Sequence, residues 1–197
     1  MNILKFVYHL KDLNIETEIA QNDHSLLFQG TLATNGESIM IKKLLGFEQP
    51  DLAETFKQVI SQYMKLDHET IVPFIGYVDM LDDDPPSEFL ITSNMRNTSL
   101  DVIIDMQKQG KCLEWWDSTR KFIFIYGIAY SLYFFHQNNA IHQNLKTSNV
   151  LIGDDRKPKL TDFQMPSLYP IQKIKKMKKK GFDFFGARNH HRKKIFR

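Results

Sequence analysis

The chain has 197 residues, a single cysteine (Cys112), 42% hydrophobic residues and a formal net charge of +3. This length predicts about one domain, and the hydrophobic content is sufficient for a core, which excludes wholesale disorder. One cysteine excludes a disulfide scaffold and a four-cysteine zinc site, and it favours a reducing compartment. Residues 1–170 carry 15 Lys+Arg and 22 Asp+Glu, whereas residues 171–197 carry 11 Lys+Arg and one acid. The sequence therefore predicts a mildly acidic body with a basic tail.

The first residues, MNILKFVYHL, contain neither a basic segment nor a small-residue cleavage site of the kind found in secretory signals. We therefore expect a cytoplasmic protein. Short apolar runs at 26–32 and 38–45 flank Asn35-Gly36. Because Asn-Gly adopts the tight turns that join antiparallel strands, these runs predict a β-hairpin.

Residues 51–66 place apolar side chains at helical spacing and predict a helix, with Asp51 as its N-cap. The later elements are bounded by turn residues, and Pro85-Pro86 excludes a helix or central strand between the next two strands. These elements are strands at 71–78 and 88–92, helices at about 99–108 and 116–137, and short strands near 149–152 and 158–161. A β-rich part followed by a helical part predicts an α+β fold with two lobes and a cleft between them.

The longest predicted helix, with Asp117 or Ser118 as its cap, contains the most apolar stretch of the chain. This stretch, Phe122–Phe135, has 14 residues. A bilayer span needs roughly 20 residues, so the stretch is too short to cross a membrane. We interpret it as a buried core helix.

Five strings occur in the order typical of one family. HQNLKTSN (142–149) is similar to the catalytic loop H-R-D-L-x-x-x-N of protein kinases at its His, Leu and Asn. TDFQ (161–164) resembles the D-F-G motif, and IMIK (39–42) resembles V-A-I-K. HETIVPFIGY (68–77) resembles the segment after the αC helix, and LITSNM (90–95) resembles the last small-lobe strand and the hinge.

The resemblance to the protein kinase superfamily covers about residues 15–168, and Lys146 places it nearest the serine/threonine or tyrosine-kinase-like branch. It implies an α+β protein-kinase-like fold with a complete β-rich small lobe at 1–95. It further implies a truncated helical large lobe at 96–170, because no A-P-E string follows the D-F-G-like motif. The basic tail at 171–197 is expected to be disordered.

The resemblance assigns binding roles to several residues. Lys42 would gather the ATP phosphates, whereas Asn149 and Asp162 would supply oxygen ligands to Mg²⁺. Thr92 at the gatekeeper position and Met95 in the hinge would line the nucleotide pocket, and Lys146 would be a catalytic residue of the catalytic loop. The alternatives are a solvated strand lysine for Lys42 and a turn-forming aspartate for Asp162.

The sequence departs from the family pattern around the expected phosphate site. The three glycine positions of the phosphate loop are occupied by Ala20, Asn22 and Ser25, and Asp23 adds a negative charge. Side chains here would crowd the phosphates, because glycine is the residue that allows the closest backbone approach. Val59 stands where a glutamate would pair with the lysine, so we expect Lys42 to be less firmly positioned.

The catalytic loop departs as well. Asn144 replaces the catalytic aspartate, and Gln143 replaces the arginine before it. A neutral amide cannot take up the substrate proton, and general-base help is typically worth about 10²–10⁴-fold in rate. Gln164 replaces the D-F-G glycine and would stiffen a hinge-like position. With a truncated large lobe, Phe122–Phe135 should also expose an apolar patch, which marks a partner surface or an aggregation liability. A third possibility is that the sequence is an incomplete product of a longer gene.

Two basic runs, at 171–180 and 188–197, form the tail. Such runs bind nucleic acid, acidic membrane or a nuclear import receptor, and the alternative is a solvated, disordered tail. His190-His191 predict no metal site, because adjacent histidines rarely chelate one ion without other ligands.

The prediction is a catalytically impaired pseudokinase that acts by binding a protein partner, with ATP and Mg²⁺ bound weakly or not at all. One alternative is an active serine/threonine kinase that transfers the ATP γ-phosphate. Another is a basic-tail adaptor for nucleic acid or membrane, with nuclear localisation through the tail.

Overall fold

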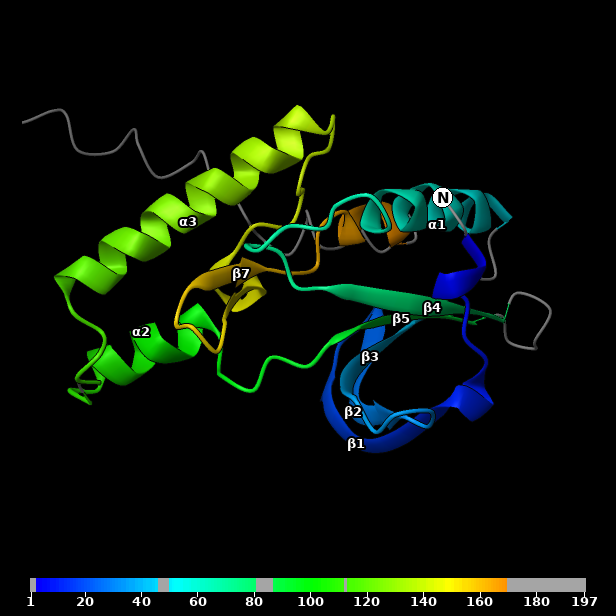
Figure 1. The fold of residues 1–197 in the computed structure, drawn as a ribbon, viewed down its shortest axis with the longest axis horizontal. Coiled ribbons are helices and arrows are strands. Elements are labelled where there is room, and N and C mark those ends of the chain that lie inside the picture. Colours follow the sequence, from blue (N-terminus) through cyan, green and yellow to red (C-terminus); the bar gives the residue numbers. More distant parts are fainter. Residues whose placement is uncertain (1–2, 46–49, 81–86, 112, 170–197) are drawn as a thin grey trace, which may run out of the picture.

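The computed structural model describes residues 3–45, 50–80, 87–111 and 113–169. Within these ranges, a sheet with one long helix is followed along the chain by a mainly helical part (Figure 1). This arrangement confirms the predicted α+β class. The basic tail, Pro85-Pro86 and Cys112 lie outside the described residues.

Five antiparallel strands form the sheet, in the order β1-β2-β3-β5-β4. Their bounds are β1 Leu13–Gln21, β2 Ser25–Leu32, β3 Ser38–Leu44, β4 Phe74–Met80 and β5 Ser87–Ser93. The predicted hairpin is confirmed, since β2 pairs with β3 and Gly36 adopts φ 71° in the connection. The expected strand at 71–78 begins later, because Ile71 instead forms a bridge with Leu160.

The edge strand β1 was not predicted from the sequence. It pairs with β2 and is exposed along all of its length except Leu13. Gly30 of β2 allows this close pairing, because a Cβ atom there would collide with the backbone oxygen of Asn14. Because β1 lies exposed at the edge of the sheet, buried and exposed residues do not alternate along it.

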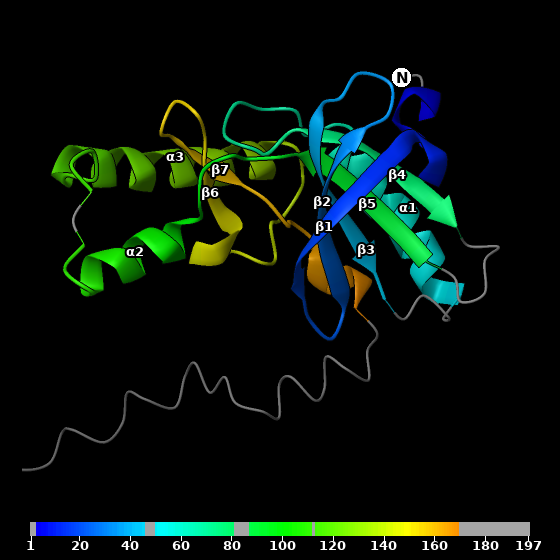
Figure 2. The same ribbon diagram turned by 90° about the horizontal axis from the view of Figure 1, so that it is seen from below.

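The helix α1 (Pro50–Tyr63) packs beside the sheet, as Figures 1 and 2 show. It begins at Pro50, so the prediction of Asp51 as N-cap is wrong. Proline is favoured in the first turn, where its missing N–H would have no helical partner. The predicted apolar face is confirmed, because Phe56, Val59 and Tyr63 are buried.

The helical part comprises α2 (Leu100–Lys108) and α3 (Ser118–Gln137), with a two-stranded sheet of β6 (Val150–Ile152) and β7 (Pro158–Leu160). Four 3-10 turns complete the described elements: η1 (Ile3–Phe6), η2 (Leu10–Asp12), η3 (Thr147–Asn149) and η4 (Met165–Leu168). Asp117 caps α3 as predicted, because its side chain accepts a 2.7 Å hydrogen bond from the Arg120 backbone N–H.

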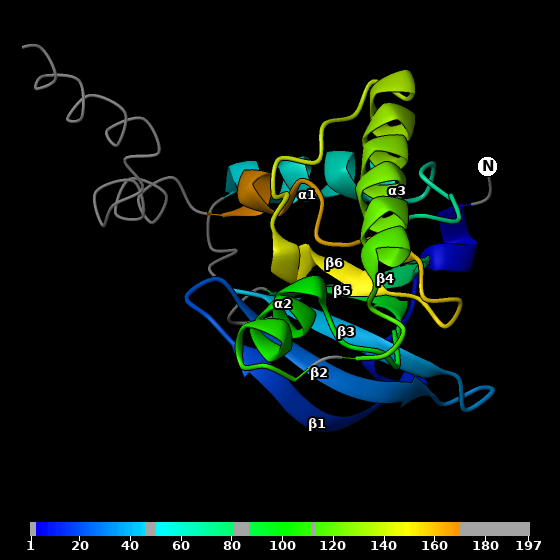
Figure 3. The same cartoon turned by 90° about the vertical axis from the view of Figure 1, so that its left-hand side faces the viewer.

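The helix α3 lies at the outside of the helical part (Figure 3) and has two different faces. The inner face is buried and consists of Phe124, Gly127, Ser131 and Phe135. The outer face exposes Phe122, Ile125, Tyr126, Tyr130 and Tyr133, with Phe122 at 69% and Ile125 at 67%. The prediction of a fully buried core helix is therefore wrong, whereas the predicted apolar patch is confirmed. Among the described residues, no helix is both long and apolar enough to span a bilayer.

Candidate functional site

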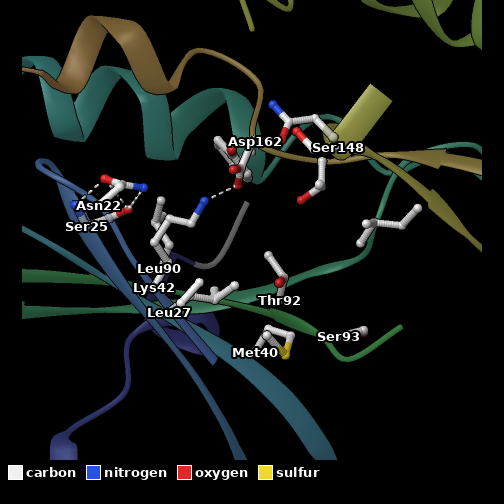
Figure 4. Close-up of a pocket in the computed structure, with 15 residues that line it drawn as sticks. Asn22, Ser25, Leu27, Met40, Lys42, Leu90, Thr92, Ser93, Ser148 and Asp162 are labelled. Carbon is white, nitrogen blue, oxygen red and sulfur yellow. Dashed lines mark hydrogen bonds and ion pairs between the residues drawn. The ribbon is translucent and has the colours of Figure 1, made fainter. Parts of the chain in front are cut away.

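A pocket of about 300 Å³ lies between the sheet and the β6–β7 region (Figure 4). Its walls combine an apolar part with a polar end. The apolar lining residues are Ala20, Leu27, Met40, Leu90 and Leu151. The other lining residues are Asn22, Ser25, Lys42, Tyr63, Thr92, Ser93, Ser148, Asn149, Thr161 and Asp162. The volume is at the lower end of the range for small-molecule sites.

Lys42 and Asp162 meet at the polar end of the pocket (Figure 4). Lys42 lies in β3 opposite Leu27 and Leu90, and its ammonium forms an ion pair with the Asp162 carboxylate. The two side chains are only 14% and 25% exposed. The resemblance assigns Lys42 to phosphate binding and Asp162 to metal binding. In the structure these two charged groups are paired with each other.

Val59 is buried in the core, as its place on the apolar face of α1 predicts. Glu54, the nearest acid toward the start of α1, is exposed. Neither side chain supplies an anionic partner for Lys42. Asp162 takes that place, and its carboxylate compensates the charge of the partly buried lysine.

Asn144 and Asn149 are linked behind the ion pair. The Asn149 side-chain N–H₂ donates to the Asn144 backbone oxygen at 2.8 Å. The Asn144 side-chain N–H₂ donates to the Asp162 backbone oxygen at 3.1 Å. The Asn149 nitrogen is thus used, so the oxygen of this amide is the atom with which Asn149 would bind a cation.

A stack of aromatic rings supports the segment that carries Asp162. The ring of Phe163 stacks on Tyr63 of α1 with 3.7 Å between centroids, and it contacts Phe135 edge-on at 5.0 Å. The Tyr63 hydroxyl donates to the Phe163 backbone oxygen at 2.9 Å. Burial raises the pKa of Tyr63 and lowers the pKa of His142, which packs edge-on against Phe135. Both side chains are therefore held in their neutral forms.

The turn between β1 and β2 contributes Asn22 and Ser25 to the lining of the pocket. The side-chain oxygen of Asn22 accepts hydrogen bonds from the backbone N–H groups of His24 at 2.8 Å and Ser25 at 2.9 Å. The His24 ring stacks on Tyr169 with 4.2 Å between centroids. Burial, with a smaller effect from Asp162, raises the pKa of Tyr169 to about 12.

The structure brings together most of the predicted binding residues. Lys42, Thr92, Asn149 and Asp162 all line the pocket, and so do the residues at the three altered glycine positions. Met95 and Lys146 are not among the lining residues, and Lys146 is exposed. The roles of these residues stay predictions.

Sequence reasoning missed Tyr63 and Ser148, which also line the pocket. Tyr63 could have been found from its place at the end of the apolar face of α1. Ser148 carried a signal as well, since it directly precedes Asn149 in the catalytic-loop-like string.

Gln164 lies next to this site and adopts a left-handed backbone with φ 58°. Its side chain reaches Gln62 of α1 at 2.5 Å, and its backbone N–H donates to the His142 oxygen at 2.7 Å. Glycine adopts this conformation without the cost that a Cβ atom imposes. The contacts of Gln164 with α1 and the catalytic-loop-like segment offset that cost.

The donor set fits a magnesium nucleotide only in part. Asp162 and Asn149 offer the carboxylate and amide oxygens that Mg²⁺ prefers. However, the Asp162 carboxylate is paired with Lys42, and the turn that would contact phosphates uses its N–H groups internally. Among the residues that the structure describes, no cluster of three or more His, Cys, Asp or Glu side chains could hold a metal ion.

Comparisons with known proteins identify the family. The family model for the protein tyrosine and serine/threonine kinase domain matches residues 13–184. Cysteine-rich receptor-like protein kinase 25 of Arabidopsis thaliana is 32% identical over 149 residues, which are 74% of this chain and 21% of that protein. Cysteine-rich receptor-like protein kinase 26 of the same plant is 30% identical over 161 residues, or 80% and 23%.

A putative G-type lectin S-receptor-like serine/threonine-protein kinase of Arabidopsis thaliana is 31% identical over 162 residues, which are 80% of this chain and 18% of that protein. The chain thus spans only about a fifth to a quarter of the length of these curated relatives. Kinase domains in general use ATP and Mg²⁺. With the family model matching most of its length, the chain belongs to the protein tyrosine and serine/threonine kinase family.

Proposed function

We propose that this chain is a catalytically impaired kinase domain, a pseudokinase, that acts by binding rather than by phosphoryl transfer. The observation that carries this proposal is the position of Asn144. Its side-chain N–H₂ donates to the Asp162 backbone oxygen, so this side chain is used as a donor next to the pocket.

The chemistry of transfer explains why this matters. When a hydroxyl oxygen attacks the γ-phosphorus, the hydroxyl proton must leave, and an aspartate in the catalytic loop accepts it. A neutral amide cannot accept that proton at physiological pH. Losing general-base help typically lowers a rate by about 10²–10⁴-fold.

The surroundings of Lys42 support the same proposal. The lysine pairs with Asp162 rather than with an acid on α1, where Val59 is buried. A magnesium ion bound at Asp162 would compete with the Lys42 ammonium for the same carboxylate. We therefore expect any binding of Mg-ATP to be weak.

A second candidate, an active serine/threonine kinase, is favoured by one observation. Lys42, Asn149 and Asp162 line the same pocket, as the resemblance requires of an active site. The names of several relatives include serine/threonine-protein kinase, such as the G-type lectin S-receptor-like protein above. Activity would then need a proton acceptor other than Asn144.

Binding through a protein surface is the other half of the proposal. The outer face of α3 exposes five large apolar side chains, including Phe122, Ile125 and Tyr126. Contiguous apolar patches on soluble domains are typical of interaction surfaces. We propose this face as the surface for a protein partner, and Ile125→Lys should weaken that interaction without unfolding the chain.

An autophosphorylation assay with γ-labelled ATP and Mg²⁺ tests the proposal. We expect no label on the chain above the level seen with Lys42→Ala. The matched control is Lys43→Ala, which removes the neighbouring lysine of β3. Label that is lost in Lys42→Ala and kept in Lys43→Ala would show Lys42-dependent transfer and overturn the pseudokinase proposal.

A further inference from the structure

In the β1–β2 turn of this chain, the backbone N–H groups of Asn22, His24 and Ser25 have acceptors within the turn. The Asn22 side-chain oxygen accepts from the N–H groups of His24 and Ser25. Figure 4 marks the contacts between Asn22 and Ser25 beside the pocket. The Asn22 side-chain nitrogen faces the Ser25 hydroxyl at 3.2 Å, and the Asn22 backbone N–H donates to the Ser25 carbonyl at 3.0 Å. One amide side chain thus occupies the place that an anionic oxygen would take.

Consecutive backbone N–H groups in a turn are a common way of binding phosphate. Here two of these groups already have an acceptor, so a phosphate would have to displace the Asn22 oxygen. Lys42, the cation of the pocket, is paired with Asp162.

The turn is also held in place from outside. His24 is buried, and its ring stacks on Tyr169 beyond η4. The His24 carbonyl accepts a 2.9 Å hydrogen bond from the Leu45 N–H after β3. Opening the turn to free its N–H groups would therefore break contacts with two separate segments.

The remaining lining of the pocket has a different character. Ala20, Leu27, Met40 and Leu151 provide apolar walls, and Thr92 and Ser93 provide hydroxyl groups beside Met40 (Figure 4). A planar, uncharged heteroaromatic ring has the shape and polarity for such walls, with a few hydrogen bonds to fix its orientation.

We propose that this pocket takes the nucleoside part of a ligand and gains nothing from a polyphosphate tail. Its ligand class is an uncharged nucleoside with a planar heteroaromatic base, such as adenosine. This inference rests on the proposed function, because it takes the pocket as a binding site without catalysis. Asn22 is the residue that sets the selectivity.

Titration calorimetry on the full 197-residue chain tests the inference with adenosine and with ATP, each with and without Mg²⁺. We expect the wild type to bind adenosine, and to bind ATP no more than fivefold more tightly than adenosine under either condition. In Asn22→Gly, both N–H groups are freed. The ATP affinity should then rise more than tenfold while the adenosine affinity stays within threefold of the wild type.

The matched control is Asn35→Gly. Asn35 makes the same kind of contact in the β2–β3 connection, where its side-chain oxygen accepts from the Glu37 N–H at 2.9 Å. This variant should keep the wild-type ratio of ATP to adenosine affinity. If Asn22→Gly does not fold, as judged by its melting curve, Asn22→Ala replaces it and carries the same expectation.

Three results would overturn the inference. The first is a wild type that binds ATP more than fivefold more tightly than adenosine. The second is no binding of adenosine at millimolar concentration. The third is an unchanged ratio when the Asn22 side chain is removed. None of these results involves phosphoryl transfer. The proposed function is contradicted by a different result, namely labelling of the chain that depends on Lys42.

Discussion

Lys42 of β3 and Asp162 form an ion pair across 120 residues of sequence, and this pair joins the sheet to the segment after β7. Its position means that the cation and the anion of the pocket neutralise each other. An incoming phosphate or metal ion would therefore compete with this contact, and the same contact stabilises the folded chain.

Asp162→Asn should lower the free energy of unfolding by about 1–2 kcal/mol, because it leaves a largely buried lysine without its anion. The control is Asp105→Asn, which removes an exposed ion pair with Lys108. Exposed pairs are worth about 0–1 kcal/mol. Urea unfolding measures both changes, and an equal effect of the two substitutions would contradict the structural importance of the Lys42–Asp162 pair.

Phe163→Ala should be the more severe change. Phe163 is buried, stacks on Tyr63 and contacts Phe135, and removing such a ring typically costs about 3–5 kcal/mol. Phe122→Ala on the exposed face of α3 should cost less than about 1 kcal/mol, because most of that ring is already in water. Chemical denaturation of both variants tests this difference, and similar midpoints would show that the stack is not part of the core.

Gly127→Val tests how α3 approaches the β6–β7 sheet. A Cβ atom at Gly127 would lie 2.5 Å from the ring of Pro158, which cannot swing aside. We expect a loss of about 1–3 kcal/mol, the usual cost of overpacking. Tyr126→Val introduces the same residue on the exposed face next to it and should change stability much less. A Gly127→Val variant as stable as Tyr126→Val would contradict the close packing.

The buried histidine predicts a pH dependence. Burial lowers the pKa of His142 below its ordinary value of 6.5, against an opposing effect of Asp162. The unfolded chain therefore binds a proton near pH 6.5, whereas the folded chain does so only at lower pH. The contribution of His142 to the free energy of unfolding is therefore present above pH 6.5 and is lost as the pH falls below 6.5.

Unfolding free energies measured between pH 7.5 and 5.5 check this prediction. His142→Phe keeps an aromatic ring but removes the titration, so its stability should fall less steeply than that of the wild type as the pH is lowered. His136→Gln, at an exposed site on α3, is the control and should keep the wild-type slope. Parallel curves for the wild type and His142→Phe would show that His142 is not responsible.

Short sequence signals of one or two residues predicted where some of the strands and helices begin and end. Asn35-Gly36 marked the β2–β3 connection, and Asp117 marked the start of α3. Pro50 was misread as lying before its helix, because proline fits the first helical position as well as the loop before it. The strand β1 was missed because its exposure along nearly all of its length leaves little hydrophobic pattern to recognise.

Only the site residues that belong to family motifs could be predicted from the sequence. Lys42, Thr92, Asn149 and Asp162 were placed in one pocket by their motifs, and the structure brings them there. The contacts between them were not predictable, because they depend on distances between segments far apart in the sequence. The Asn22 turn had a local signal, since Asn and Ser at the ends of a four-residue turn often bond to its backbone.

The central claim is that Asn144 deprives this kinase-family domain of a proton acceptor. The most direct measurement is a single-turnover assay of phosphoryl transfer from γ-labelled ATP to a peptide library, comparing the wild type, Asn144→Asp and Lys42→Ala. We predict that the wild type transfers no more label than Lys42→Ala. Transfer by the wild type at a rate within tenfold of Asn144→Asp, and lost in Lys42→Ala, would contradict the claim.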